Sequence, residues 1–282
     1  MYYLYLSIIC SVSVAALFKM IKGKSISIFP IIHFNYILAI FYCYYFFDSR
    51  IYSFNFYMPN LHIYIVLGVL LPLLFILLNK SIQQVGIIKT DIAQRFSLII
   101  PIVFATLFWN QQFSFGKILG VLLAFIAIFC ILLKKGEKGT AKNYVSPVLV
   151  LVGYGIVDVL FKKVALISSI PYTSSLLFIF VIAFIIASIY AFIKRKKMIY
   201  NLDTIKWGLL LGSLNFINIY TYIKAHQELK SNPTIVFITM NLGVILLSTF
   251  VGYFIFKEKI NKINTIGIFF ALLSILLINL FN

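Results

Sequence analysis

The chain has 282 residues, of which 62% are hydrophobic and only 11% are charged, and its mean hydropathy is +1.05. A soluble domain carries about 25% charged residues because its surface has to be hydrated. The net charge of +17 would suggest nucleic acid in a soluble protein. Here the Lys and Arg residues lie mostly in short gaps between apolar runs, as they do in membrane loops. The composition therefore excludes a soluble globular protein and argues against nucleic acid as a partner.

Ten apolar runs follow one another along the chain. A bilayer core about 30 Å thick needs about 20 apolar residues per helix, and each run has roughly that length. A span in lipid has to satisfy its own backbone hydrogen bonds, so continuous runs predict helices rather than the short alternating strands of a barrel. The predicted fold is an all-α integral membrane protein with ten transmembrane helices, over residues 2–20, 28–47, 62–80, 85–109, 115–134, 145–166, 171–193, 204–226, 232–256 and 263–281.

Prolines and glycines mark the ends and the contacts of these runs. Three prolines lie near the start of a run, where a missing N–H costs little: Pro30, Pro171 and Pro233. Two pairs of glycines one turn apart predict close helix packing: Gly116 with Gly120, and Gly208 with Gly212. The three cysteines lie singly inside apolar runs, so neither a disulfide framework nor a metal site is predicted.

The two halves of the chain resemble each other. An offset of 147 residues pairs similar side chains in the same order, namely Gln94 with Asn241, Gln111 with Glu258, and Gly120 with Gly267. Residues 17–19 also resemble residues 160–162. Because each half has five runs, an odd number, the second half enters the membrane from the opposite side, which predicts an inverted repeat of residues 1–140 and 141–282. Duplication for packing alone is the alternative.

With these features the sequence resembles the drug/metabolite transporter superfamily, in its EamA-like branch. Members of that branch have ten helices in two five-helix repeats, and each repeat ends with a Gly/Lys-Glu-Lys/Arg type of turn before its last helix. In the second half, residues 231–233 (SNP) open a helix, residues 256–259 (FKEK) close it, and residues 263–278 resemble the final helix. The first half departs from the pattern, because Gln111 stands where Glu is usual.

Charged side chains inside spans mark the predicted substrate site, since each costs a few kcal/mol unless it is paired or hydrated. Asp158 lies near the middle of the sixth run and is suited to bind a cationic group or to carry a coupling proton. The alternative is an i,i+4 pair with Lys162 that only locks the helix. Arg95 is suited to clamp a carboxylate or phosphate; alternatively, it only neutralises Asp91, one turn before it.

Neutral polar side chains extend this candidate site. Gln94 and Asn241 occupy equivalent positions of the repeat and are expected to reach the cavity, with interhelical hydrogen bonding as the alternative. His33 and Asn35 lie on the second run. A lone His is more often a packed residue than a ligand, although its near-neutral pKa keeps proton coupling open.

One face of the eighth run carries three polar residues. Asn215, Asn218 and Tyr222 follow the spacing i, i+3, i+7, which places them on the same side of a helix. We expect this stripe to line the cavity. Together with the charged residues it would suit a zwitterionic or otherwise polar metabolite.

The predicted function is secondary transport of such a metabolite across the cytoplasmic membrane by alternating access. The chain shows no Walker A pattern, so direct use of ATP is not expected. A lipid or lipid-linked carrier flippase of the same fold is the alternative, and an integral membrane enzyme is a weaker one because clustered catalytic residues are missing. The expected partners are a small-molecule substrate, a coupling proton or sodium ion, and the bilayer; no cofactor is expected, and the oligomeric state is open.

The orientation in the membrane is predicted from basic residues. The odd-numbered loops hold 18 of the 24 Lys and Arg residues and the even-numbered loops hold 6. The positive-inside rule then places the odd loops in the cytoplasm and both termini outside. The family resemblance implies the opposite, cytoplasmic termini, and we favour the charge count.

Overall fold

The computed structural model describes residues 1–21, 28–47, 57–85, 87–109, 114–132, 145–193, 201–255, 257 and 262–281, and these residues are all-α. Gln111 and Glu258, which the repeat pairs, lie outside them. The α-helices are α1 (Tyr2–Ile21), α2 (Ile28–Phe41), α4 (Leu61–Val85), α5 (Ile87–Phe96), α6 (Ile99–Phe108), α7 (Phe115–Leu132), α8 (Val145–Leu166), α9 (Tyr172–Ile193), α10 (Leu202–Glu228), α11 (Pro233–Phe254) and α12 (Lys262–Leu280). A π-helix, η1 (Tyr42–Phe46), extends α2, and a short 3-10 helix, η2 (Met58–Asn60), precedes α4.

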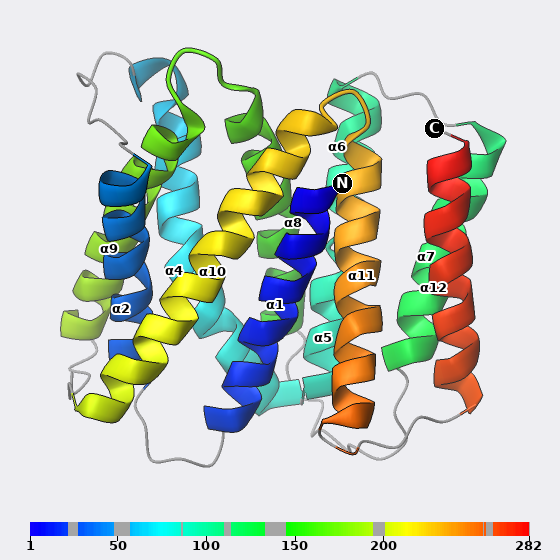
Figure 1. Cartoon of the computed structure of the whole chain (residues 1–282), viewed down its shortest axis with the longest axis horizontal. Helices are drawn as coiled ribbons and strands as arrows, with labels where there is room; N and C mark the ends of the chain where they lie inside the picture. Colours follow the sequence, from blue (N-terminus) through cyan, green and yellow to red (C-terminus); the bar gives the residue numbers. More distant parts are fainter. Residues whose placement is uncertain are drawn as a thin grey trace.

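The helices match the predicted spans. The run over residues 85–109 forms two stacked helices, α5 and α6, and every other run is built around one α-helix. Among the described residues, five helices are long and apolar enough to cross a membrane, judged by length and composition, and three further apolar stretches are shorter. The helices run side by side between two faces, and both termini lie toward the same face (Figure 1). This arrangement is that of a multi-pass membrane protein.

Local sequence signals explain where helices begin. α10 starts with a capping box, in which the Thr204 N–H donates to the Asn201 side chain at 2.8 Å and the Asn201 N–H donates to Thr204 Oγ1 at 3.0 Å. These bonds satisfy N–H groups that the first turn of a helix leaves free. Pro233 is in the first turn of α11 and Pro171 directly precedes α9. The structure thus confirms the expectation that these prolines lie near helix starts.

The predicted glycine pairs lie at close helix contacts. A Cβ atom placed on Gly208 would lie 2.5 Å from Cβ of Phe34 on α2, and one on Gly212 would lie 3.1 Å from Cα of Asn35. A Cβ atom on Gly120 would lie 2.6 Å from Cγ1 of Ile278 on α12. Backbones approach this closely only where a side chain is missing, so the packing role of both pairs is confirmed.

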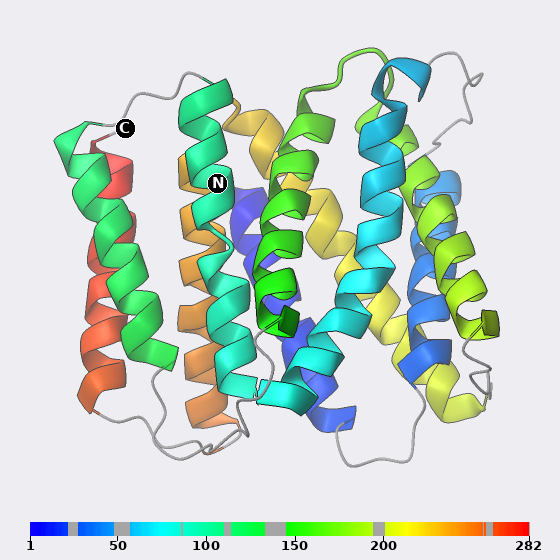
Figure 2. The ribbon, with the colours of Figure 1, turned by 180° about the vertical axis from the view of Figure 1, so that it is seen from behind.

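The same packing scheme occurs twice in the bundle. α10 packs on α2 and α1, while α4 packs on α9 and α8. Likewise α1 packs on α11, and α8 packs on α5 and α6. α7 and α12 pack extensively against each other and form a pair at one edge of the bundle in both views (Figures 1 and 2). Each scheme thus joins a helix of the first half to one of the second.

The contact between α7 and α12 is itself reciprocal. Gly120 of α7 lies against Ile278 of α12, and Gly267 of α12 lies against Ile131 of α7. Adding 147 to Gly120 gives Gly267, and subtracting 147 from Ile278 gives Ile131, so the two contacts are related by the shift that the sequence predicts for a repeat. Ser274 adds a hydrogen bond to the Gly120 carbonyl at 2.7 Å, so this pair combines close packing with a polar contact.

We expect Gly120→Val to weaken the α7–α12 pair, because the added side chain has to displace Ile278. Overpacking of this kind costs about 1–3 kcal/mol, and the midpoint of thermal unfolding in detergent should fall. The matched control is Leu119→Val, at a neighbouring side chain that is exposed on the bundle surface and should leave the midpoint nearly unchanged. Equal midpoints for Gly120→Val and the parent protein would contradict the described packing.

Candidate functional site

A break in the fourth span is the first feature of the site. Pro101 lies four residues after Ser97, so it cannot donate the usual helical bond to the Ser97 carbonyl, and its ring clashes with that carbonyl. Instead the Ile100 N–H donates to Ser97 O at 3.0 Å, and Ser97 Oγ donates to Gln94 O at 2.6 Å. The result is a turn between α5 and α6 in place of the continuous helix that the sequence predicted.

This break is buried against α8. Both α5 and α6 pack on α8, and Gly155 of α8 lies directly against the Ile100 side chain. Irregular backbone at membrane depth is tolerated only where protein covers it or where it lines a cavity. Substrate and ion sites of transporters lie at such broken helices near the bilayer midplane. The α5–α6 turn and the part of α8 beside it are therefore the candidate site.

Asp158 lies in this region and takes its hydrogen bond from α10. Tyr222 Oη donates to Asp158 Oδ1 at 3.0 Å, and the charge of Arg95, in the last turn of α5, attracts the Asp158 carboxyl group. Asp158 lies eight residues before the end of α8, or about 12 Å at the rise of an α-helix. An ionised carboxylate accepts up to about four hydrogen bonds. The described residues supply one of them, which leaves acceptor positions for a ligand.

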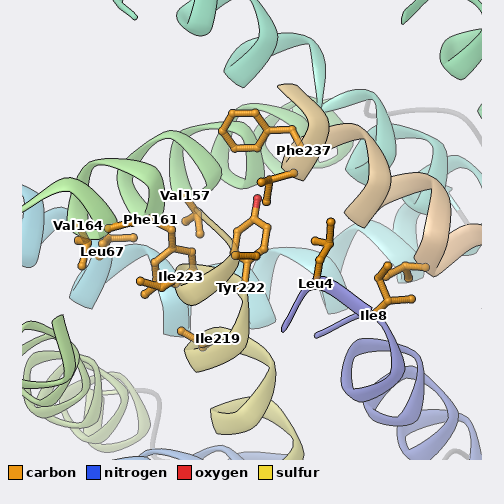
Figure 3. Close-up of a cluster of buried hydrophobic side chains, with 14 of the residues drawn as sticks. Leu4, Ile8, Leu67, Val157, Phe161, Val164, Ile219, Tyr222, Ile223 and Phe237 are labelled. Atoms are coloured by element: carbon orange, nitrogen blue, oxygen red, sulfur yellow. The ribbon is translucent and has the colours of Figure 1, made fainter. Parts of the chain in front are cut away.

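Tyr222 is held firmly by its apolar neighbours. Its ring packs edge-on against Phe161 of α8, with ring centroids 6.3 Å apart. In the close-up it projects from α10 into the space between Phe161, Leu4 of α1 and Phe237 of α11 (Figure 3). The hydroxyl thus reaches Asp158 from a fixed ring, so the hydrogen bond orients the carboxylate.

Lys162 does not pair with Asp158. Its side chain is fully buried, and its ammonium donates to the carbonyls of His226 at 3.3 Å and Lys230 at 2.9 Å. These carbonyls belong to the C-terminal end of α10 and the turn after it, where a positive charge is favourable. Within the described parts of the chain no ion pair joins the two α8 residues, so the helix-locking pair considered from the sequence is not formed in this conformation.

Two asparagines of the α10 stripe bond to other helices. Asn215 Nδ2 donates to Asn35 Oδ1 on α2 at 2.9 Å. Ser7 Oγ on α1 donates to Asn218 Oδ1 at 2.6 Å. The stripe therefore faces α2, α1 and α8 in turn, and Tyr222 is the member that meets Asp158. In this conformation Asn215 and Asn218 act as interhelical contacts.

His33 lies apart from Asp158, between α2 and α9. Its Nε2 is 3.3 Å from Ser188 Oγ, and its ring lies 5.4 Å from that of Phe184. A cavity beside it, also lined by Ile32 and Pro72, has a volume of about 10 Å³. Such a cavity holds about one water molecule and no metabolite. In this conformation His33 is therefore a packed residue and not a substrate ligand.

The equivalent pair Gln94 and Asn241 makes mainly local contacts. Asn241 is buried and its Nδ2 donates to the Phe237 carbonyl of its own helix at 3.0 Å. Gln94 lies in the last turns of α5, next to Arg95 and the helix break. Whether both side chains reach one cavity stays a prediction. The side chain of Asp91, which the sequence offered as a partner of Arg95, lies outside the described part of the structure.

Sequence reasoning missed three polar residues of the interior. Ser7 and Tyr36 lie inside apolar runs without a pattern that marks them, and both are buried. His226 is also fully buried, and it follows Tyr222 by four residues, so it continues the face that begins at Asn215. Extending the stripe by one turn would have found it. Among the described residues, no group of three or more His, Cys, Asp or Glu side chains is arranged to hold a metal ion.

The hydrogen bond between Asp158 and Tyr222 should be measurable in a double-mutant cycle. Asp158→Asn and Tyr222→Phe are expected to couple by about 0.5–1.5 kcal/mol in the free energy of unfolding from mixed micelles, the usual worth of one such bond. In the control cycle, Tyr220→Phe on the same helix should combine additively with Asp158→Asn. A coupling energy of zero for Tyr222 would show that the bond contributes nothing to the fold.

Comparison with known proteins identifies relatives of this chain. The sequence model of the EamA-like transporter family matches residues 144–280. A protein of Haemophilus influenzae, described as an uncharacterized protein, is 42% identical over 284 residues, which cover 98% of this chain and 96% of that protein. A solved crystal structure of a protein superimposes with a TM-score of 0.80 over 99% of this chain and 96% of that chain. At 12% identity this last similarity concerns the fold alone.

Proposed function

Because the chain belongs to the EamA-like transporter family, and is thus a multi-pass membrane protein and a secondary transporter, we propose that it carries a small polar or zwitterionic metabolite bound at Asp158. The observation that supports this substrate class is the environment of Asp158. Its carboxyl group lies inside the bundle beside a broken helix and, among the residues that the structure describes, accepts one hydrogen bond, from Tyr222.

The chemistry of the site fits a substrate with hydrogen-bond donors. An ammonium or hydroxyl group would fill the acceptor positions of Asp158 that Tyr222 leaves open. The Asp158 carboxylate in turn faces the positive charge of Arg95, whose guanidinium has five N–H donors. A solute that offers both donors and acceptors therefore fits better than an apolar one.

The proposed mechanism is alternating access between two inverted halves, residues 1–140 and 141–282. The repeated packing scheme supports it, because α10 on α2 and α1 corresponds to α4 on α9 and α8. The reciprocal contacts of Gly120 with Ile278 and of Gly267 with Ile131 support it as well. In an inverted repeat, two similar halves exchange conformations and open a central site to each side in turn.

The coupling ion would act at the same carboxylate. An acidic side chain inside a membrane span is expensive and is a usual carrier of protons or binder of cations. When α8 and α10 move relative to each other, the bond from Tyr222 to Asp158 breaks and the carboxylate needs a new partner. A proton, a sodium ion or the substrate itself can supply it, and the pH dependence of transport distinguishes the first from the others.

A lipid or lipid-linked flippase is the second candidate. A groove of about 200 Å³ opens between α6 and α7 and is lined by Ile102, Val103, Thr106, Ile118, Val121 and Leu122. Its apolar lining suits an acyl chain, which is the feature that favours this function. Lipid scrambling by the reconstituted protein would test it, and a polar metabolite should then fail to drive exchange.

We expect Asp158→Asn to reduce transport in proteoliposomes by at least about tenfold, the effect of losing one hydrogen bond to a charged group. The measurement is counterflow against a panel of polar and zwitterionic metabolites, at several pH values. Asp203→Asn, at the exposed start of α10, is the matched control and should transport normally. Unchanged rate and unchanged pH dependence in Asp158→Asn would remove this residue from the mechanism.

We also propose that the protein lies in the cytoplasmic membrane with both termini outside. The termini share one face of the bundle (Figure 1), and the excess of basic residues belongs to the loops of the other face. Fusions at either end should show activity of a periplasm-dependent phosphatase and no fluorescence of a cytoplasm-dependent reporter. Cytoplasmic signals at both ends would overturn the charge-based orientation.

A further inference from the structure

We propose that Lys162 and His226 form an anion-binding subsite, which takes a carboxylate or another small oxyanion group of the transported solute. The inference rests on the proposed function only in assigning the anion to the solute; the binding site itself is argued from the α8–α10 contact. Arg95 was the residue expected to bind such a group, whereas the structure sets its charge against Asp158.

The subsite lies at one of two successive polar contacts between α8 and α10. α8 and α10 run in the same direction through the bundle (Figure 1). Asp158 bonds to Tyr222, and Lys162 bonds to the backbone of His226, and both contacts join residues 64 positions apart. Residues four apart are neighbours on a helix surface, about 5–6 Å between Cβ atoms. The Lys162 contact therefore lies one turn closer to the end of α8 than the Asp158 contact.

Lys162 carries a buried charge that lacks a negative counterpart. Its side chain is fully buried, and within the described residues no carboxylate lies within 4.0 Å of its ammonium. The two carbonyls that it bonds belong to the end of α10, which provides only about half an elementary negative charge. A buried ammonium is costly unless it is paired, and its third N–H remains available.

His226 is the observation that points to a ligand. It is fully buried, and both of its ring nitrogens lack a hydrogen-bond partner. Its ring lies against two aromatic rings, with centroids 4.7 Å from Tyr222 and 4.8 Å from Phe237. Buried polar atoms without partners are rare and call for a specific explanation. A capping role explains the two bonds of Lys162 but leaves this imidazole unexplained.

The surrounding charges favour an anion. The charge of Lys162 acts on the His226 imidazole, and the charge of Lys230, in the turn after α10, acts on Lys162. Asp158 is engaged one turn away by Tyr222, and α11 contributes the apolar ring of Phe237. An oxyanion between the Lys162 ammonium and an imidazole N–H would accept a charge-assisted hydrogen bond from the first and satisfy the second.

The position suits a group that enters from the face with the termini. Lys162 lies four residues before the end of α8, about 6 Å at the helical rise, whereas Asp158 is one turn deeper. Lys162 and His226 would therefore hold a negative group of the solute, and Asp158, one turn deeper, would hold a positive or hydrogen-bond-donating group. This gives the site a polarity along the transport path.

The test uses the full chain in nanodiscs of zwitterionic lipid, with ¹⁵N-labelled histidine and acetate or inorganic phosphate as the probe. The His226 resonances, assigned with His226→Gln, should shift in a saturable manner with either anion, while chloride serves as the control for ionic strength. His62, exposed on α4, should not respond. Lys162→Met should weaken the apparent affinity by about tenfold or more, the effect of losing one hydrogen bond to a charged group.

The matched control is Lys163→Met. Lys163 is the next residue along α8 and its ammonium lies 5.2 Å from the centre of the Phe104 ring, so its removal should leave anion binding unchanged. If Lys162→Met does not fold, anion-induced thermal stabilisation of the parent protein and its loss in His226→Gln provide the same comparison.

Three outcomes would overturn the proposal: no shift of His226 with acetate or phosphate, equal effects of Lys162→Met and Lys163→Met, or a shift caused by phosphatidylglycerol in the nanodisc and not by free anions. The last outcome would assign the subsite to a lipid headgroup. None of these results bears on the transport assay with Asp158→Asn, so failure of the subsite and failure of the proposed function are distinguishable.

Discussion

The absence of water in the bilayer is the constraint on which the interior of this bundle depends. A charged side chain there has to find its partners within the protein. Two charged residues of α8 find theirs on α10 and the turn after it: Asp158 accepts a bond from Tyr222, and Lys162 donates to the carbonyls of His226 and Lys230. The contact between α8 and α10 therefore holds much of the polar chemistry of the described core. This contact also links two parts of the bundle, because α8 packs on α4, α5 and α6, whereas α10 packs on α1 and α2.

This arrangement makes the α8–α10 contact sensitive to movement. A motion that separates the two helices removes the partners of Asp158 and Lys162 at the same time. The two residues lie one turn apart on α8, at the spacing of an i,i+4 ion pair, so after separation they can neutralise each other without a change in the backbone. In the conformation described, this pairing, which the sequence offered as an alternative, is not formed.

Much of the fold could be predicted from the sequence, because lipid imposes one element type and one length. The apolar runs gave the spans, and the glycine pairs gave real contacts such as that of Gly120 with Ile278. The break at Ser97 was missed, although Pro101 inside a predicted helix was its signal. The site was predictable only in part. A stripe on one helix shows which residues share a face, but not which neighbour meets it, so the partners of Asn215 and Asn218 on α2 and α1 had to come from the structure. His226 was overlooked because the polar stripe of that helix was not followed for one more turn beyond Tyr222.

The two halves differ most where the candidate site lies. The shift of 147 residues places Ser248 opposite Pro101, and α11 continues through Ser248 without a break, with Ser248 Oγ bonded to the Ile245 carbonyl. The same shift places Leu242, which is fully buried, opposite Arg95. One half thus supplies a broken helix with a guanidinium at the break, and the other supplies a continuous apolar helix. Symmetric packing is enough to let two halves exchange conformations, but it cannot by itself define a polar solute. We therefore expect the selectivity to come from residues that differ between the halves, such as Arg95, Asp158 and His226, which lie on α8 and on the helices α5 and α10 that pack against it.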